Sequence, residues 1–550
     1  MHCPGGHKEL KTNNIHEPSS LEQPERWLSI KLGKIERSTL MLYVSILIYG
    51  IIFSALTILR YGAFRARAWD LGIFTQSLWT TLNANKFFYH TCELLMNPSG
   101  SFFGVHFSPM LFFVLPFYLV ATRPETLLVL QSFVLALAAV PIYKLAKEYA
   151  GGRTVGLMFA AVYLIYPSTQ YVNMFDFHIQ SFLPLFFSFT IYYLTKENWP
   201  KYFLFMFLAL SCEEHAAWTA FAMGIYVAWK YRTQLISTIR GHKPLARIVL
   251  VPLATMAVSG VWYWFTLWQR DTFFPTNPQA LPDFLGASNF SILGAKNPVE
   301  IPLLIFLRPL NAIQALVYDG QIKLLYLLLL FGPLAFFSLR APSALIPAVP
   351  WLGWSLLSQT QAHHALGHQY ETYMVSFIFA AATFGLAKYQ RRNSNSKPII
   401  SFLKKSSRPR YIATASLIFF LIVNPMSPVI SHLFPNYVKF SIDDHERLIS
   451  ETINLVPPNA SILTQDNIFP YVSHRVDAYV VPVLFLNSGI HNITVAFVNQ
   501  TIDKVEYILV DSKTDPIATE LILSMLAVKN NFDLLSSRDD NTILLYHRKP

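Results

Sequence analysis

Long apolar runs separated by short polar segments dominate the first 430 residues of the chain. Residues 39–59 contain no charged side chain, and a helix of this length, rising about 1.5 Å per residue, crosses the roughly 30 Å hydrocarbon core of a bilayer. Runs of the same kind recur downstream and predict about eleven membrane-spanning helices. We place these helices at residues 39–59, 125–145, 154–170, 179–195, 201–212, 216–230, 248–268, 322–339, 342–358, 371–387 and 411–430.

The positions of lysine and arginine predict the orientation of these helices. Basic residues precede the first apolar run, and positively charged segments tend to stay in the cytoplasm. We therefore expect a cytoplasmic N-terminus and an external first loop. Later basic clusters also lie inside if the short apolar segment 107–120, which contains Pro116, does not cross the membrane. The C-terminal segment is then external, and we expect a multi-pass protein of the cell membrane.

The composition agrees with a membrane protein. Of the 550 residues, 53% are hydrophobic and 14% are charged, whereas soluble domains carry about 25% charged residues. The formal net charge of +11 would suggest nucleic acid in a soluble protein. Here the basic residues fall in the predicted cytoplasmic loops, so we expect a lipid bilayer as partner and no nucleic acid. The oligomeric state stays open.

Charged residues and strand-length apolar runs return after the last apolar helix, and they predict a small external α/β domain. We expect helices at 445–455, 467–474 and 516–528, strands at 460–464, 479–482 and 506–511, and a hairpin at 532–548. A glycine-rich phosphate loop is missing from this region of the sequence, so the pattern does not indicate nucleotide binding.

The predicted organisation therefore has three parts. Residues 1–38 form a cytoplasmic tail, residues 39–430 an all-α polytopic transmembrane domain with an external loop at 60–124, and residues 431–550 the external α/β domain.

A carboxylate stands among aromatic residues in the first external loop. Asp70 and Gln76 lie in the segment W-D-L-G-I-F-T-Q-S-L-W at 69–79, whose composition suits an amphipathic helix at the membrane surface. Asp70 is then either a solvated charge on that helix or a general base that takes a proton from an acceptor hydroxyl.

Two further acidic motifs follow predicted spans directly. Asp176 and His178 lie in F-D-F-H, and Glu213 and Glu214 lie in L-S-C-E-E-H at 210–215. Helix capping is one explanation for Asp176. Ionisable groups at membrane depth are costly and suggest function. Carboxylates and histidine could bind a divalent cation, Mg²⁺ or Mn²⁺, and we name Asp176, His178 and Glu213 as its candidate ligands.

A third polar segment gathers histidines and tyrosines immediately before a span. His368 and Tyr370 lie in Q-A-H-H-A-L-G-H-Q-Y-E-T-Y at 361–373. Such residues are either anchors at the membrane surface or contacts for a lipid phosphate. Arginines of the external segments could stabilise the leaving phosphate. The candidate binding residues are Arg65, Arg67, Gln76, His106, His178, His368 and Tyr370.

Several of these motifs together resemble a known family. The W-D-L-G-I-F-T-Q-S-L-W segment, G-V-H-F-S-P at 104–109, P-I-Y-K-L-A at 141–146, F-D-F-H, the C-E-E-H position and H-Q-Y at 368–370 resemble a domain-of-unknown-function family of archaeal and bacterial polytopic membrane proteins. That family is similar in layout to the GT-C class of membrane glycosyltransferases.

The resemblance implies a GT-C fold, a catalytic acid in the first external loop, a second acidic motif in a later loop and a sugar donor carried on a lipid phosphate. Asp70 matches the first acid and Asp176 the second. The family position at Glu213 and Glu214 usually reads Lys-Glu-Asp, whereas here Cys212 and His215 flank the two glutamates. Glu213 is therefore the carried-over acid.

The function predicted from these observations is transfer of a hexose or pentose from a polyprenyl-phosphate-linked donor to an acceptor on the external face. A nucleotide-sugar would be cytosolic, whereas the candidate acids Asp70, Asp176 and Glu213 are expected outside. Two alternatives remain: a secondary transporter with proline-kinked helices around a pathway, and a non-catalytic membrane protein of the cell envelope.

Overall fold

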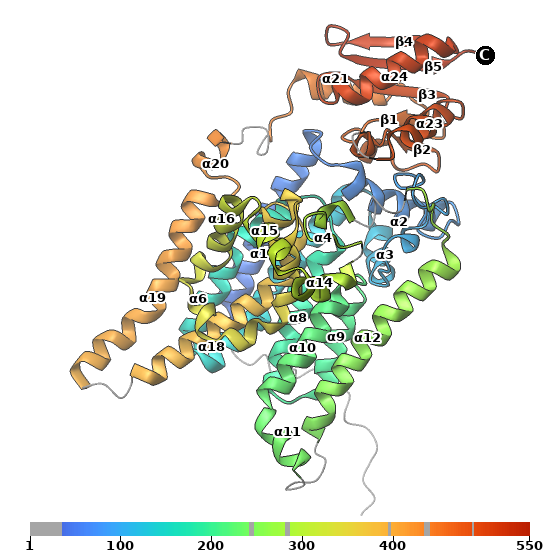
Figure 1. The fold of residues 1–550 in the computed structure, drawn as a ribbon. Coiled ribbons are helices and arrows are strands. Elements are labelled where there is room, and N and C mark those ends of the chain that lie inside the picture. The colour runs from blue at the N-terminus through green and yellow to red at the C-terminus, as the bar shows by residue number, and fades with distance from the viewer. Residues whose placement is uncertain are drawn as a thin grey trace, which may run out of the picture.

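A helical bundle with a small sheet domain at one end makes up the computed structural model (Figure 1). The structure describes residues 36–240, 247–280, 287–296, 298–393, 398–433, 440–486 and 489–550. The predicted tail at 1–38 therefore lies almost entirely outside the described residues. The mostly helical class with a C-terminal sheet is confirmed.

The first part of the bundle runs from α1 to α10. Apolar side chains of α1 that point away from its neighbours stay exposed, among them Leu47 and Ile51, as expected for a helix that faces lipid. The opposite face of α1 packs on α4 and α6. The helices are α1 (Arg37–Gly62), α2 (Ile73–Asn83), α3 (Leu111–Val120), α4 (Pro124–Leu137), α5 (Ala139–Tyr149), α6 (Arg153–Leu164), α7 (Pro167–Met174), α8 (Leu183–Thr195), α9 (Trp199–Leu210) and α10 (Ala216–Lys230).

The second part of the bundle packs against the first. α12 lies along α10, and α18 packs against α5 and α8. The helices are α11 (Arg232–Ile239), α12 (Arg247–Phe273), α14 (Ile301–Leu307), α15 (Pro309–Val317), α16 (Gly320–Phe331), α17 (Val349–Leu357), α18 (Val375–Asn393), α19 (Pro398–Val423) and α20 (Pro428–Leu433).

The predicted number of spans is not confirmed. Among the described residues, four helical segments are long and apolar enough to cross a membrane, and up to six if each of two bent pairs counts as one span. The bent pairs are α6 with α7, at 41°, and α15 with the segment Gly320–Leu334, at 74°. Pro167 stands at the first turn after the break in the first pair, where proline is compatible with a helix start. The segment predicted not to cross contains the ten-residue helix α3.

The C-terminal domain is a five-stranded sheet in the order β2-β1-β3-β5-β4. β1 pairs in parallel with β2 and β3, whereas β5 pairs antiparallel with β3 and β4. The elements are α21 (Asp444–Ile453), β1 (Ile462–Thr464), α22 (Phe469–Val472), β2 (Ala478–Val480), α23 (His491–Ile502), β3 (Tyr507–Asp511), α24 (Pro516–Lys529), β4 (Phe532–Arg538) and β5 (Ile543–Arg548).

This domain agrees with the predicted elements except at α23, which the sequence analysis did not predict. Strands β1, β2 and β3, helices α21, α22 and α24 and the hairpin of β4 and β5 all lie within one to three residues of their expected bounds. α23 contains several β-branched residues, which have low helix propensity.

The C-terminal domain packs directly on the loop that follows α1. Gln76 of α2 is fully buried, and its amide donates to the backbone oxygens of Arg475 and Ala478, at 3.1 and 3.3 Å. Its oxygen accepts from Thr91 N–H at 2.8 Å. In this structure Gln76 therefore joins the loop to the C-terminal domain.

We predict that Gly72→Ala destabilises this junction. A Cβ at Gly72 would lie 2.7 Å from Cδ1 of the fully buried Phe469, and such overpacking costs about 1–3 kcal/mol. The apparent melting temperature of the detergent-purified protein should fall. Gly260→Ala is the control, because a Cβ there meets no described atom within 4 Å. Equal melting temperatures for the two variants would contradict the prediction.

Candidate active site

A buried ion pair joins the end of α1 to the segment that follows α7. Arg60 Nη1 lies 2.6 Å from Asp176 Oδ1, and both side chains are buried. The second oxygen, Oδ2, accepts from the Arg67 backbone N–H at 2.7 Å. Burial raises the pKa of Asp176, which Arg60 opposes. Both carboxylate oxygens therefore have fixed partners, and the ion pair holds the loop between Arg60 and Arg67 against residue 176.

Asp70 lies on the short π-helix η1 (Ala68–Gly72), directly after this loop. Its Oδ1 is 2.9 Å from His178 Nε2, and Nδ1 of the same ring is 3.0 Å from the Asp176 backbone oxygen. Burial lowers the pKa of His178, but the hydrogen bonds and charges of Asp70 and Asp176 together raise it more. Both ring nitrogens face acceptors, and both can donate when the ring is the imidazolium. π-helical turns are frequent at functional sites.

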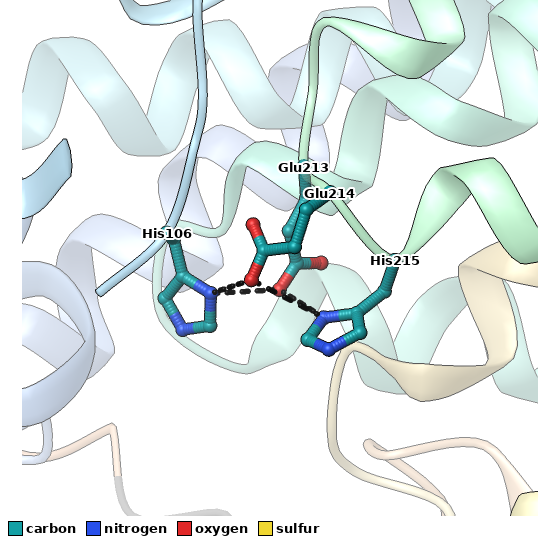
Figure 2. Close-up of side chains that lie close together, drawn as sticks. All are labelled: His106, Glu213, Glu214 and His215. Carbon is teal, nitrogen blue, oxygen red and sulfur yellow. Dashed lines mark hydrogen bonds and ion pairs between the residues drawn. The ribbon is translucent and has the colours of Figure 1, made fainter. Parts of the chain in front are cut away.

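A second cluster consists of His106, Glu213, Glu214 and His215 (Figure 2). His106 Nδ1 lies 3.1 Å from Glu213 Oε1 and 3.0 Å from Glu214 Oε1. His215 Nδ1 lies 3.2 and 3.6 Å from the same two oxygens. The glutamates stand on the turn between α9 and α10, and His106 comes from the loop before α3.

The charges in this cluster stabilise each other. Burial lowers the pKa of His106, but Glu214 and Glu213 raise it to about 10. Burial raises the pKa of Glu214, but the two histidines lower it to about 2. The pKa of His215 is likewise raised by the glutamates against the effect of burial. At neutral pH His106 and Glu214 therefore form an imidazolium–carboxylate pair.

The cluster lines a cavity of about 660 Å³. Arg270, Tyr370 and Tyr373 also line it, together with Trp351 and Trp354. The cavity reaches the surface at Val299, whose side chain is exposed. A pocket of this size with an apolar wall and a few converging polar groups is typical of a small-molecule site.

Tyr370 lies between the two clusters. Burial raises the pKa of its hydroxyl, and the charges of Asp70 and Glu213 add to the shift. His368 stands nearby, with its ring 5.0 Å from that of Phe175, and burial lowers its pKa. The structure thus brings Asp70, His178, His368 and Tyr370 to one region. Tyr370 lines the cavity, whereas Asp70, His178 and His368 are not among its lining residues.

The remaining predicted residues are placed differently. Asp176 and His178 do not join Glu213 in a group close enough for one ion; among the described residues, Glu213 instead joins His106, Glu214 and His215. Arg67 Nη1 bonds to Asp466 Oδ2 of the C-terminal domain at 2.9 Å. Arg65 is partly buried, and burial lowers its pKa. Arg65 and Arg67 are not among the residues that line the cavity.

The sequence analysis did not assign a role to His215, Gln180 or Tyr373. His215 directly follows the two glutamates, so its position was a usable signal. Gln180 Nε2 donates to Glu213 Oε2 at 2.9 Å, and the Tyr373 hydroxyl donates to the same oxygen. These two contacts span 33 and 160 residues of sequence, and no local pattern reveals them.

A model of one protein family matches residues 60–543. The chain belongs to the DUF2079 family of predicted membrane proteins. This confirms the resemblance to a domain-of-unknown-function family. No curated protein matches the chain.

Solved structures give a distant likeness to this DUF2079 protein. ArnT from Cupriavidus metallidurans, crystallised with undecaprenyl phosphate, is 12% identical, and the match covers 92% of this chain and 97% of ArnT with a TM-score of 0.44. The oligosaccharyltransferase AglB from Archaeoglobus fulgidus, in complex with an inhibitory peptide and a dolichol-phosphate, is 10% identical. That match covers 93% of this chain and 74% of AglB with a TM-score of 0.40.

We predict that Arg60→Met destabilises the protein by about 3–5 kcal/mol, because it leaves the Asp176 carboxylate buried without its cation. The double variant Arg60→Met/Asp176→Asn should recover much of this loss, since the Asn oxygen still accepts from Arg67 N–H. Thermal unfolding in detergent measures the stability of the single and the double variant.

Arg447→Met serves as the control for this pair. Its guanidinium is exposed and pairs with the exposed Asp444 of the same helix, α21, and such pairs contribute about 0–1 kcal/mol. A loss at Arg60 no larger than that at Arg447 would show that the buried pair does not hold the loop.

Proposed function

We propose that this DUF2079 protein is a membrane glycosyltransferase that moves a sugar from a polyprenyl-phosphate-linked donor to an acceptor hydroxyl. The observation that supports this most is the Asp70–His178 pair, which Tyr370 connects to a cavity lined by cationic and aromatic side chains. Tyr370 makes this connection because it lines the cavity and the charge of Asp70 helps to raise the pKa of the Tyr370 hydroxyl.

Asp70 is the proposed general base. One oxygen is oriented by His178, and no hydrogen bond to the other is found among the described residues. In the proposed reaction, that oxygen takes the proton of the acceptor hydroxyl while the acceptor oxygen bonds to the anomeric carbon. The bond from this carbon to the phosphate oxygen breaks through an oxocarbenium-like state, and the lipid phosphate leaves with the bonding electrons.

The cavity supplies the charge for the leaving phosphate. Arg270, His106 and His215 line it, and cationic donors in a site that excludes water stabilise a departing phosphate strongly. The aromatic wall, with Trp351 stacked on Tyr373 at 3.9 Å between ring centroids, offers an apolar surface for the lipid or the sugar face. A divalent cation as an additional phosphate ligand belongs to this proposal.

The side of the membrane on which the site lies is also part of the proposal. With the N-terminus in the cytoplasm and the C-terminal domain outside, both clusters would face the external compartment. A lipid carrier is then the donor that reaches them, because the lipid can present the sugar on that side.

A secondary transporter is the second candidate. The two bent helix pairs, at 41° and 74°, are of the kind that transporters use to line a pathway. A transporter would take up a solute into vesicles without releasing lipid phosphate, so the assay below separates the two functions.

The test is release of lipid phosphate from polyprenyl phosphates that carry a hexose or pentose, with purified protein in detergent. Asp70→Asn should lower the rate by about 10²–10⁴-fold, since base catalysis supplies a factor of this size. Asp533→Asn, at an exposed carboxylate of β4, should leave the rate unchanged. Full activity of Asp70→Asn would reject the assigned base.

A further inference from the structure

We propose that His106, Glu213, Glu214 and His215 bind one first-row transition-metal dication, of the Zn²⁺ or Mn²⁺ type, whose remaining coordination positions face the cavity. The inference rests on the geometry of the four side chains and deepens the proposed function by naming the ion that would meet the leaving phosphate.

The spacing of the donor atoms fits a single ion. One donor atom from each of the four side chains lies within 4.8 Å of the other three, and the distances from histidine Nδ1 to glutamate Oε1 are 3.0–3.6 Å. Ligands at roughly 2.0–2.2 Å from a tetrahedral ion stand about 3.3–3.6 Å apart. A small adjustment of the side chains therefore suffices to bring all four donors into contact with an ion.

The other carboxylate oxygens are already fixed. Glu213 Oε2 accepts from Gln180 Nε2 and from the Tyr373 hydroxyl, and Glu214 Oε2 accepts from the Phe107 backbone N–H at 2.9 Å. Each glutamate is thus turned so that its Oε1 points to the shared centre. Outer hydrogen bonds of this kind orient ligands in metal sites and often contribute 10–100-fold to affinity.

The backbone that carries the ligands is also held in place. The segment after His106 bonds to the turn after α9 through Ser108 Oγ to the Cys212 oxygen, at 2.6 Å, and Met110 N–H to the Ser211 oxygen, at 2.9 Å. The His215 ring packs against Trp218, with centroids 4.8 Å apart. These contacts join the two ligand-bearing segments independently of any ion.

The kind of donor indicates the kind of metal. Two imidazole nitrogens suit Zn²⁺ and related transition metals, and the two carboxylates also accommodate Mn²⁺, whereas Mg²⁺ prefers carboxylates, phosphates and water. The Asp176 region is a poorer site, because Arg60 and the Arg67 N–H occupy both oxygens of that carboxylate. This replaces the predicted ligand set of Asp176, His178 and Glu213.

The ion would face a ligand in the cavity. The four side chains share its wall with Arg270 and Tyr370, and an ion held by these four donors can expand to five-coordination, so a phosphate oxygen or water can take the fifth position. Under the proposed function, that oxygen belongs to the leaving lipid phosphate.

The test measures metal content directly. Full-length protein purified in detergent is stripped with a chelator, exposed to Zn²⁺, Mn²⁺ or Mg²⁺ separately, desalted and analysed by elemental mass spectrometry. We expect about one equivalent of Zn²⁺ or Mn²⁺ per chain and no retained Mg²⁺, since the four donors bind one ion of the imidazole-preferring class. Co²⁺ should give the absorption bands of a nitrogen–oxygen site in the same protein.

Ligand variants locate the ion. Glu213→Gln/Glu214→Gln should weaken Zn²⁺ binding at least 100-fold, and Glu371→Gln, a buried carboxyl outside the cluster, should leave it unchanged. If the double variant does not fold, His215→Asn leaves the contacts of both glutamates with His106 in place and should still weaken binding at least 10-fold.

Unchanged binding in these variants, or equal retention of Mg²⁺, would overturn the metal site. Metal content does not depend on turnover, so a metal-loaded protein that releases no lipid phosphate would reject the proposed function while the site stands. Activity that persists in metal-free protein would leave the transferase proposal intact and remove the ion from it.

Discussion

The Arg60–Asp176 ion pair is the contact on which the arrangement of the site depends. A buried carboxylate is expensive unless its charge is compensated, and Asp176 meets this cost with Arg60 at the end of α1 and the backbone N–H of Arg67. Asp176 thereby fixes both ends of the turn that leads into η1, with Arg60 at one end and the Arg67 N–H at the other. Gln131 of α4 adds to this by bonding the backbone of Asp176 and His178, so Asp70 and His178 meet with little freedom.

The two clusters compensate buried charge in different ways. Asp176 is balanced by a guanidinium on one oxygen and a backbone donor on the other. The glutamates at 213 and 214 are balanced by two imidazoles, which can lose a proton and become metal ligands. The arginine beside Asp176 stays charged, so that pair is structural. The histidines beside the two glutamates can lose their protons, so that cluster can bind a metal ion.

The sequence predicted the elements better than it predicted their contacts. Apolar runs of strand length and turn residues located the C-terminal strands, because both signals are local in the sequence. The predicted span count is not confirmed, because several apolar runs of the described residues form short or bent helices, and a hydropathy pattern does not record such breaks. Asp70 and Glu213 could be singled out as charges in apolar surroundings. Their partners His178 and His106 lie more than a hundred residues away, and only the packed bundle pairs them.

The C-terminal domain also holds the loop that carries Asp70. Asp466 Oδ1 accepts from the Ala68 N–H at 2.7 Å, at the first residue of η1, and Oδ2 binds the Arg67 guanidinium. Thr75 bonds Ser473, and Gln76 bonds the backbone ahead of β2. The loop that carries Asp70 is thus bonded on one side to the bundle through Asp176 and on the other to the C-terminal domain through Asp466. A domain that fixes both the start of η1 and the helix after it is part of the site's framework, because any shift of the domain would move Asp70 relative to His178.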